Sequence, residues 1–488
     1  MNGAMIIFIL GYVLKIEGAL MLPSCVTALV YREQEGWAYL IGAALCLITG
    51  QILSHKKPEN TVFYLKDGCV ATALSWIVLS AFGALPFVFT GEIPSFTDAM
   101  FETVSGFTTT GSSILTNVEA LSHASLFWRS FTHWIGGMGV LVFLLAVLPL
   151  SGGSHFNLMR AESPGPSVGK LVPKVGATAQ ILYIIYFAMT VVEILLLILG
   201  GMDAFDSILI SFGSAGTGGF GIKIDSCAGY TAYQQWVITI SMILFGVNFN
   251  AYYFLVFGKV KKAFGMEEVR WYFLIILAAI AIIFVSILEM YGTAFEALTH
   301  AAFQVGTIIT TTGYSTTDFN LWPQVAKVVL VLLMFIGACA GSTGGGIKVS
   351  RIVILGKTAI REMNSHIHPK SIRNIKFEDK PVESEVVRSI CVYLATFVFL
   401  FCGSVFLISL EGKDLVTTFT SVAATINNIG PGLEVVGPNG NFACFTDLSK
   451  WVFIFDMLAG RLELFPLLIL FHPGLWKEQF VRNRMKKK

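Results

Sequence analysis

The chain has 488 residues, of which 55% are hydrophobic and only 13% are charged, and its mean hydropathy is +0.72. This composition excludes an ordinary soluble domain and places the chain among polytopic membrane proteins. The net charge is only +2, so any signal for orientation has to come from how the charges are distributed.

Ten apolar stretches are long enough to cross a membrane, whose hydrocarbon core of about 30 Å requires roughly 20 apolar residues per helix. We therefore expect an all-α polytopic membrane protein with spans at residues 4–30, 37–54, 69–90, 125–149, 178–200, 233–257, 272–291, 324–354, 388–410 and 448–471. With both termini in the cytoplasm, the outer loops contain only four basic residues, Arg32, Lys223, Lys413 and Lys450. This asymmetry predicts the orientation, because basic loops stay in the cytoplasm.

Short amphiphilic segments recur between the spans, and each ends in glycine with small polar residues. They read FTDAMFETVSGFTTTGSS (96–113), FDSILISFGSAGTGGFG (205–221), FEALTHAAFQVGTIITTTGYS (295–315) and LVTTFTSVAATINNIGPG (415–432). Aligned on their endings, they place Gly111, Gly219, Gly313 and Gly430 at one equivalent position. The repeated unit is therefore span, short helix, glycine loop and span. It predicts an N-terminal two-helix extension at 1–66 and pore repeats at 67–177, 178–271, 272–387 and 388–488.

The four glycine loops predict a pathway for a cation. One such loop is equally consistent with a broken helix or an outer turn, but four in register indicate a shared axis. Irregular backbone at membrane depth is tolerated only where it is buried or lines a watery cavity. Glycine can turn carbonyls toward that axis and threonine adds hydroxyl oxygens, so that oxygen rings replace the water shell of a cation. The predicted filter residues are Thr109, Thr110, Gly111, Thr217, Gly218, Gly219, Thr311, Thr312, Gly313, Asn428, Ile429 and Gly430.

The eighth predicted span contains the glycine-rich segment GACAGSTGGG at residues 337–346. A continuous helix is disfavoured there, because each glycine costs about 1 kcal/mol relative to alanine. Close helix packing through small residues is one interpretation, whereas a phosphate-binding loop fails because Ile347 stands where that motif requires lysine. The other interpretation is a loop beneath the filter that blocks the pathway. The candidate gate residues are Gly341, Ser342, Thr343, Gly344, Gly345, Gly346 and Lys348.

Arg461 lies in the last predicted span, where a charge exposed to lipid is costly, so we expect its side chain to face the interior. It either forms a structural ion pair with Asp456 or Glu463, or it faces the pathway below the filter and opposes the passage of cations. Glu102, in the first short helix, is expected to brace the filter through bonds to the backbone.

The span pattern, the four pore loops and the segments FWRSFTHWIGGMG (127–139), GACAGSTGGGIKVSR (337–351) and FDMLAGRLELFP (455–466) resemble the TrkH branch of the TrkH/KtrB/HKT potassium transporters. The resemblance covers essentially the whole chain. It implies a pseudo-fourfold pore in each subunit, a homodimer, and a cytosolic ring of nucleotide-binding TrkA subunits as partner. It also implies that the 337–346 segment and Arg461 form the gate, and that glycine rather than serine at position 111 suits K⁺. Asn427, Asn428 and Ile429 depart from a symmetric filter, which leaves the degree of preference for K⁺ over Na⁺ open.

Three alternatives remain beside this K⁺ uptake subunit of a bacterial inner membrane. One is a Na⁺-permeable or H⁺- or Na⁺-coupled symporter of the same superfamily. Another is a transporter of a small organic solute, although such proteins usually show two repeated halves. A third, a membrane enzyme, would need a cluster of acids, bases or metal ligands, which the sequence lacks.

We expect no prosthetic group, no nucleic-acid partner and no nucleotide site within the chain, and attraction of the basic loop 355–388 to anionic lipid. Cys227 and Cys444 both fall in predicted outer loops, and the sequence leaves open whether they pair.

Overall fold

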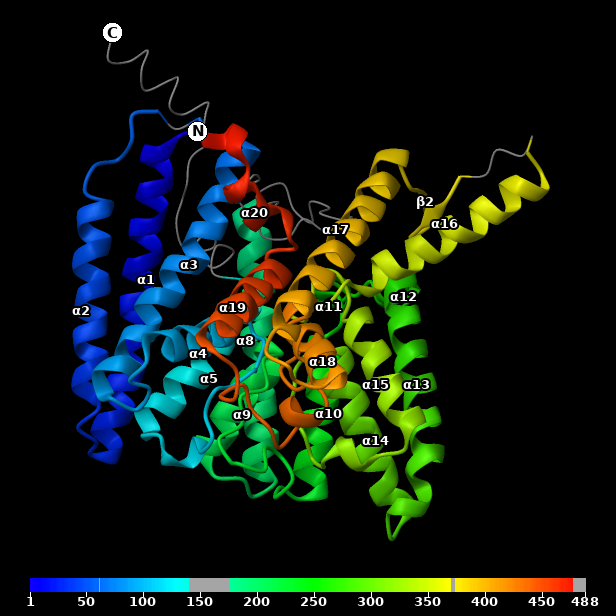
Figure 1. Ribbon diagram of the computed structural model, residues 1–488, viewed down its shortest axis with the longest axis horizontal. Coiled ribbons are helices and arrows are strands. Elements are labelled where there is room, and N and C mark those ends of the chain that lie inside the picture. Colours follow the sequence, from blue (N-terminus) through cyan, green and yellow to red (C-terminus); the bar gives the residue numbers. More distant parts are fainter. Residues whose placement is uncertain (61, 140–174, 370–373, 477–488) are drawn as a thin grey trace.

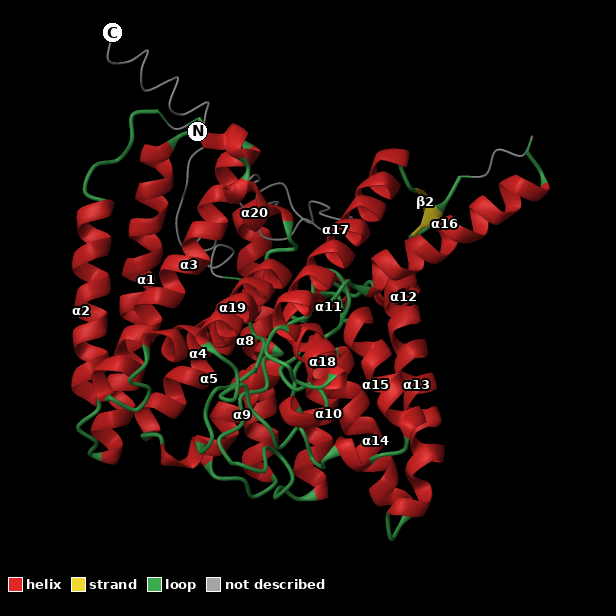
Figure 2. Cartoon of the chain, in the orientation of Figure 1, coloured by secondary structure: helices red, strands yellow, loops and turns green. Residues whose placement is uncertain are grey.

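The computed structural model describes residues 1–60, 62–139, 175–369 and 374–476. Helices make up almost all of its regular structure (Figure 2). In Figure 1 the long helices stand side by side, and α16 (Val349–Ile367) projects sideways from the upper end of the bundle, where the N terminus also lies. Two short strands, β1 (Lys376–Phe377) and β2 (Lys380–Pro381), form an antiparallel hairpin beside α16.

The first two helices, α1 (Gly3–Tyr31) and α2 (Gly36–Leu53), pack along one another as an antiparallel pair. Gly11 and Gly50 allow the closest approach, because a β-carbon on Gly50 would lie only 2.6 Å from the carbonyl oxygen of Gly11. Small residues at such crossings let helix backbones pack closely without a hydrophobic driving force. The two spans predicted at 4–30 and 37–54 are therefore confirmed as helices.

The rest of the chain repeats one order of elements four times: a long helix, a short helix, an extended loop and a second helix. The long helices are α3 (Leu65–Thr90), α8 (Val175–Leu199), α13 (Glu267–Ile287) and α17 (Ser384–Ser409). The short helices, called pore helices below, are α4 (Phe96–Phe107), α9 (Ala204–Gly216), α14 (Ala294–Ile309) and α18 (Leu415–Ile426). The second helices are α5 (His123–Gly137), α10 (Ala232–Phe245) with α11 (Phe249–Val256), α15 (Gln324–Ile336) with α16, and α19 (Asp447–Arg461) with α20 (Phe465–Leu468).

Short elements complete the connections between these units. Four 3-10 turns follow or precede the pore helices: η1 (Val118–Ala120), η2 (Leu288–Met290), η3 (Phe319–Leu321) and η4 (Glu434–Val436). A short helix, α12 (Val260–Gly265), precedes α13, and η5 (Ile469–Phe471) follows α20.

Several of the ten predicted spans are not continuous helices, because the second helices of the repeats are short or broken. Among the described residues, six helices are long and apolar enough to cross a membrane, or seven if α10 and α11 count as one span. Those two helices meet at an angle of 93°, so the span predicted at 233–257 is interrupted. The break has a local cause, because the side chain of Asn248 accepts a bond from the backbone N–H of Asn250 and starts a new helix.

Three further predicted spans differ from the structure. The span at 324–354 is interrupted after α15, where Gly337 adopts a positive φ of 72°, and this confirms that the glycine-rich segment breaks the helix. The span at 448–471 is interrupted after α19, where Glu463 and Leu464 also have positive φ angles. The α5 helix ends at Gly137, and residues 140–149 of the span predicted at 125–149 lie outside the described residues.

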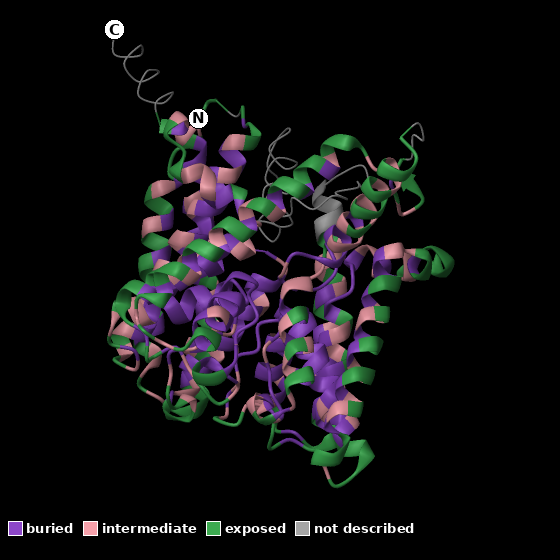
Figure 3. Ribbon diagram, turned by 45° about the vertical axis from the view of Figure 1, so that its right-hand side comes forward, coloured by how far each residue is buried: buried purple, intermediate pink, exposed green. Residues whose placement is uncertain are grey.

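The buried core gathers in the middle of the bundle, where the pore helices and their loops meet (Figure 3). Every residue of α4 from Ala99 to Phe107 is buried. The outward faces of α2, α8, α13 and α17 instead expose large apolar side chains such as Leu199 and Phe399, as expected of faces that contact lipid. Cys227 is buried and Cys444 is exposed, and both thiols are free, so this pair forms no disulfide.

Candidate functional site

All four pore helices begin and end in the same way. A side chain caps the first turn of each one, from Ser95, Asp203, Thr293 and Asp414. At the other end one residue adopts the left-handed conformation: Thr109, Thr217, Thr311 and Asn428, with φ angles of 55°, 54°, 61° and 55°. The N–H of the next residue then bonds over 2.8 Å to a carbonyl five residues earlier, from Thr110 to Ser105, Gly218 to Gly213, Thr312 to Thr307 and Ile429 to Ala424. This is the hydrogen-bond pattern of a Schellman cap. Because all four pore helices share it, the backbone leaves each of them in the same way.

The four equivalent glycines follow this cap, and each again has a positive φ: 81° at Gly111, 74° at Gly219, 93° at Gly313 and 100° at Gly430. Each packs against the carbonyl group that precedes the glycine of the next repeat. A β-carbon on Gly111 would lie 2.0 Å from the Gly218 oxygen, one on Gly219 would lie 1.9 Å from the Thr312 oxygen, one on Gly313 would lie 2.2 Å from the Ile429 oxygen, and one on Gly430 would lie 2.9 Å from the Thr110 oxygen. The contacts run from the first repeat to the fourth and back to the first, so they form a closed ring.

This ring, called the glycine ring below, gathers all twelve predicted filter residues at one place. The sequence departure in the fourth loop does not change its backbone, because Asn428 and Gly430 have the same conformations as their equivalents. The side chain of Asn428 instead joins the fourth repeat to the first, donating over 2.9 Å to the hydroxyl of Thr110 and over 2.9 Å to the carbonyl of Met457.

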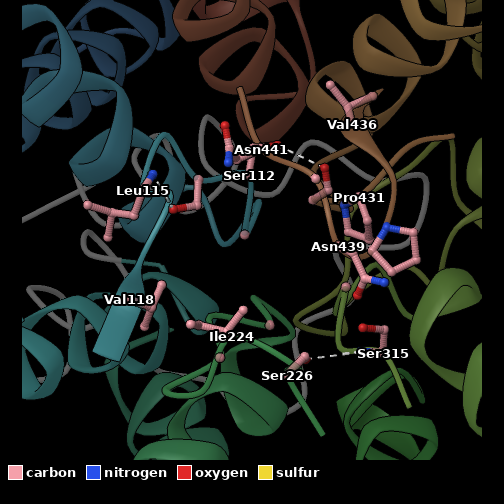
Figure 4. A pocket seen from close by; sticks show the side chains of 18 of the residues that line it. Ser112, Leu115, Val118, Ile224, Ser226, Ser315, Pro431, Val436, Asn439 and Asn441 are labelled. Atoms are coloured by element: carbon pink, nitrogen blue, oxygen red, sulfur yellow. Dashed lines mark hydrogen bonds between the residues drawn. The ribbon is translucent and has the colours of Figure 1, made fainter. Parts of the chain in front are cut away.

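A pocket opens on the side of the glycine ring facing the lower end of the bundle, and all four ring glycines line it. Figure 4 shows Ser112, Ser226, Ser315 and Pro431 around its open centre, one from each of the four repeats. The backbone N–H of Ser315 donates to the hydroxyl of Ser226 over 3.2 Å and so joins the third repeat to the second. Ser112 also donates to the carbonyl of Gly430 over 3.0 Å. Converging carbonyl dipoles at the bottom of a polar pocket are suited to receive a cation that has lost part of its hydration shell.

A buried ion pair braces the first two loops from behind. Arg129 donates from Nε to Glu102 over 2.6 Å and from Nη1 to the carbonyl of Gly221 over 2.8 Å. Glu102 also accepts the backbone N–H of Ile114 over 3.0 Å, which confirms the predicted bond from its carboxylate to the backbone of the first loop. His133 bonds through Nδ1 to the carbonyl of Gly106 and accepts the N–H of Phe220 at Nε2, so its neutral Nδ1–H form holds the pore helix and the second loop together.

On the other side of the glycine ring lies the loop at residues 337–348, called the intramembrane loop below. The N–H of Gly345 donates to the hydroxyl of Thr311 over 2.6 Å. A β-carbon on Gly345 would lie 2.4 Å from the carbonyl oxygen of Asn427, and one on Gly344 would lie 2.7 Å from that of Thr310. The loop is therefore in direct contact with the third and fourth filter loops. Its glycines allow this close contact, and they place irregular backbone on the side of the glycine ring opposite the pocket.

The polar side chains of the intramembrane loop bond to backbone carbonyls. Ser342 donates to Cys339 over 2.6 Å, Thr343 donates to Phe245 over 3.3 Å, and Lys348 donates to Gly344. Thr343 and Lys348 are buried, whereas Ser342 is only half-buried. The loop is thereby folded onto itself and onto the end of α10.

Arg461 connects this loop to a different repeat. Its Nη1 donates to the carbonyl of Thr343 over 2.8 Å, and its Nη2 donates to the carbonyls of Gly136 and, over 2.9 Å, Gly137 at the end of α5. The two carboxylates suggested as partners have other contacts: Glu463 pairs with Arg351, and Asp456 accepts the hydroxyl of Ser404. The position of Arg461 was apparent from the sequence, but its acceptors on α5 were not, because they lie more than 320 residues earlier.

Comparison with known proteins identifies the family. The model of the family described as "TrkH: Cation transport protein" matches residues 36–480. The chain belongs to the TrkH family. The resemblance noted in the sequence is thus confirmed, and the chain is a polytopic, all-α membrane protein of a family of cation transporters.

Individual members of the TrkH family match along nearly their whole length. The chain is 37% identical to the Trk system potassium uptake protein TrkH of Salmonella typhimurium over 475 residues, which are 96% of this chain and 97% of that protein. It is 31% identical to TrkG of Escherichia coli over 478 residues, which are 96% and 97% of the two chains. The crystal structure of the potassium transporter TrkH from Vibrio parahaemolyticus superimposes with a TM-score of 0.88 at 32% identity, covering 98% of this chain and 100% of that one.

Proposed function

We propose that this protein transports K⁺ across the membrane as the membrane subunit of a Trk-type potassium uptake system. The observation that carries the proposal is the closed glycine ring, in which four loops of one chain present equivalent carbonyl groups around one axis. Similar proteins named as Trk system potassium uptake proteins support the choice of ion. The transported K⁺ is cargo, and no catalytic role is proposed.

In this proposal the twelve filter residues, from Thr109 to Gly430, bind K⁺ as it sheds water. The glycine at each ring position keeps the neighbouring carbonyl group free of side-chain contact. A fixed ring of carbonyl oxygens can replace hydration for one ion size better than for another. The repeats containing these residues are taken to begin and end as the sequence indicates, at 67–177, 178–271, 272–387 and 388–488.

The intramembrane loop and Arg461 are proposed to form the gate. The loop lies against the inner ends of the third and fourth filter loops. Arg461 adds a positive charge and a bridge between this loop and α5. In the described arrangement both features oppose the passage of a cation toward the upper end of the bundle.

We place the upper end of the bundle in the cytoplasm and the protein in the cell's inner membrane, with both termini cytoplasmic. The described basic segments, at residues 54–60 and in α16 with the hairpin that follows it, lie at that end. Two partners are included in the proposal. The projecting part of α16 exposes an apolar stripe of Ile360, Met363 and Ile367, which supports a homodimer because the stripe repeats at helical spacing. A cytosolic TrkA-type ring of nucleotide-binding subunits is the second partner, because the resemblance to TrkH proteins implies it and similar proteins are named as parts of a Trk system.

The test is ion flux into vesicles that contain the purified protein. Reversal potentials measured in opposing K⁺, Na⁺ and H⁺ gradients should follow the K⁺ gradient. A potential that follows Na⁺ or H⁺ would identify a Na⁺-permeable protein or a coupled symporter instead. Vesicles that show no K⁺ or Rb⁺ flux with or without the cytosolic partner would contradict the proposal.

A further inference from the structure

Glu268, in the first turn of α13, is a buried carboxylate that contacts neither the filter nor Arg461. Its side chain is only 2% exposed. Its Oε1 accepts the backbone N–H of Ala340 over 2.7 Å and that of Ser350 over 3.2 Å. Its Oε2 accepts the amide of Asn248 over 3.1 Å. All three contacts are donors to the carboxylate, which is the arrangement that suits its ionised form.

These three donors belong to the parts of the structure that enclose the intramembrane loop. Ala340 lies within the loop, Ser350 lies in the first turn of α16 directly after it, and Asn248 lies at the break between α10 and α11. The carboxylate therefore binds the backbone both near the start of the loop, at Ala340, and just after its end, at Ser350. It also lies at the N-terminal end of α16, where a negative charge is favoured. Neighbouring backbone bonds from Cys339 to Gly246 and from Phe249 to Gly341 hold the same break against the loop.

The helix end that carries Glu268 is itself fixed by the hairpin of β1 and β2. Glu378, in the turn of that hairpin, accepts the backbone N–H of Glu268 over 3.2 Å. Lys357 of α16 pairs with Glu267 over 2.5 Å and donates to the carbonyl of Lys376 over 2.7 Å. The hairpin, α13 and α16 are thus joined at the point where Glu268 reaches the loop.

We infer that Glu268 is a latch: a positioning residue whose carboxylate holds the intramembrane loop against the filter, and whose own position is set by the hairpin at residues 376–381. This inference rests on the proposed function only where it says that movement of the loop controls K⁺ flux. The movement itself can be observed without measuring flux. For the loop to move away from the filter, the hydrogen bond from Ala340 to Glu268 has to break.

The test uses two native cysteines as reporters. Cys339 lies in the intramembrane loop and is buried, and Cys227 lies in an outer segment and is also buried. Cleavage after lysine releases residues 328–348 and 224–259, each with one of these cysteines as its sole cysteine. Mass spectrometry can therefore follow the rate at which a small thiol reagent labels each site in the purified full-length protein.

Glu268→Gln removes the charge and replaces one acceptor by a donor. Hydrogen bonds to charged groups are stronger than those to neutral groups, so the loss of the negative charge should weaken the hold on the loop. We expect the labelling rate of Cys339 to rise about ten-fold, while that of Cys227 stays unchanged. The matched control is Glu289→Gln, the same substitution at an exposed position just beyond the other end of α13, which should label at the wild-type rate. Glu268→Asp keeps the charge but is one methylene shorter, so it should give an intermediate rate.

The outcomes separate the latch from other roles. An unchanged Cys339 rate in both Glu268 variants would overturn the inference, and so would labelling of Cys227 and Cys339 together, because that pattern would mean that Glu268 is needed for folding. Rb⁺ flux into vesicles without the cytosolic partner should rise in Glu268→Gln. Faster Cys339 labelling without any K⁺ or Rb⁺ flux in the wild type would support the latch and contradict the proposed function.

Discussion

The backbone of Gly219 lies so close to the carbonyl group of Thr312 that a β-carbon on Gly219 would be 1.9 Å from the Thr312 oxygen. No atom can occupy that position, so any side chain there displaces the carbonyl of the third filter loop. Gly219 also has a φ of 74°, a conformation that residues with a β-carbon adopt at a cost of about 1 to 2 kcal/mol.

Gly219→Ala is therefore expected to abolish selectivity for K⁺ or to reduce flux at least ten-fold. The measurement is the reversal potential of vesicles with K⁺ on one side and Na⁺ on the other. The control is Gly91→Ala, because Gly91 has a similar φ of 75° but nothing within 4 Å of its would-be β-carbon. Wild-type selectivity in Gly219→Ala would show that the ring does not form the filter.

Arg461→Ala should raise K⁺ leak in the absence of the cytosolic partner, because it removes both the charge below the filter and the bridge from Thr343 to Gly137. Arg461→Lys distinguishes these two effects. Lysine keeps the charge but lacks the planar fork that reaches two carbonyls. A leak in Arg461→Ala that is absent in Arg461→Lys would assign the effect to charge, and a leak in both would assign it to the bridge.

Single-channel recording or flux without the partner provides the measurement for these variants. Arg388→Ala, at an exposed position of α17, serves as the control and should leave the leak unchanged. If Arg461→Ala shows neither a greater leak nor altered dependence on the partner, Arg461 has no part in the gate.

Glu102→Gln should lower the stability of the protein strongly, because it leaves the guanidinium of Arg129 buried without its charged partner. Breaking one side of a buried pair typically costs about 3 to 5 kcal/mol. Asp206→Asn is the comparison, since the pair of Asp206 with Lys223 is partly exposed and such pairs contribute at most about 1 kcal/mol. Thermal unfolding in detergent should separate the two variants clearly, and equal melting temperatures would contradict the bracing role of Glu102.

The cap of α18 should contribute to stability in a pH-dependent way. Bonds from the hydroxyl and the backbone N–H of Thr417 hold the pKa of Asp414 below its ordinary value. A lowered pKa means that the cap stabilises the fold fully above the pKa of an unfolded aspartate, about 3.9, and that this contribution is lost as the pH falls through the lower folded-state value. Asp414→Ala should thus destabilise α18 by about 1 kcal/mol near pH 7 and by little at the acidic limit.

The equivalent cap of α4 supplies the control for this prediction. Ser95 does not titrate, so Ser95→Ala should cost a similar amount at both pH values. Hydrogen exchange in the first turn of each helix would measure both effects. A constant difference between Asp414→Ala and the wild type across the pH range would contradict the assignment.

Much of the site could be predicted from the sequence because it depends on local chemistry. The four pore helices, their glycine endings and the glycine-rich interruption after α15 are all visible as short patterns. The backbone of the fourth loop shows how far such patterns reach, since Asn428 takes the left-handed conformation that threonine takes in the other three loops. The N–H of Ile429 also makes the same capping bond as its equivalents in those loops. The cap, rather than the residue type, fixes that shape.

Other features could not be predicted because they depend on contacts between distant parts of the chain. The break between α10 and α11 lies in a largely apolar stretch, where Gly246, Asn248 and Asn250 are weak local signs. The bridge from Arg461 to α5 and the reach of Glu268 to Ala340 join residues 72 or more positions apart. Apolar composition indicates burial, but it does not indicate which backbone groups a buried charge will meet.

The glycine ring has a consequence for how such a pore can change over time. In a channel built from four identical chains, every substitution appears four times. Here a single polypeptide supplies all four quarters, so one quarter can be altered while its three neighbours are preserved, as Asn428 and its bond to Thr110 illustrate. Each ring glycine nevertheless packs against a carbonyl group of the next repeat. A repeat can therefore change only in ways that leave that carbonyl group in place.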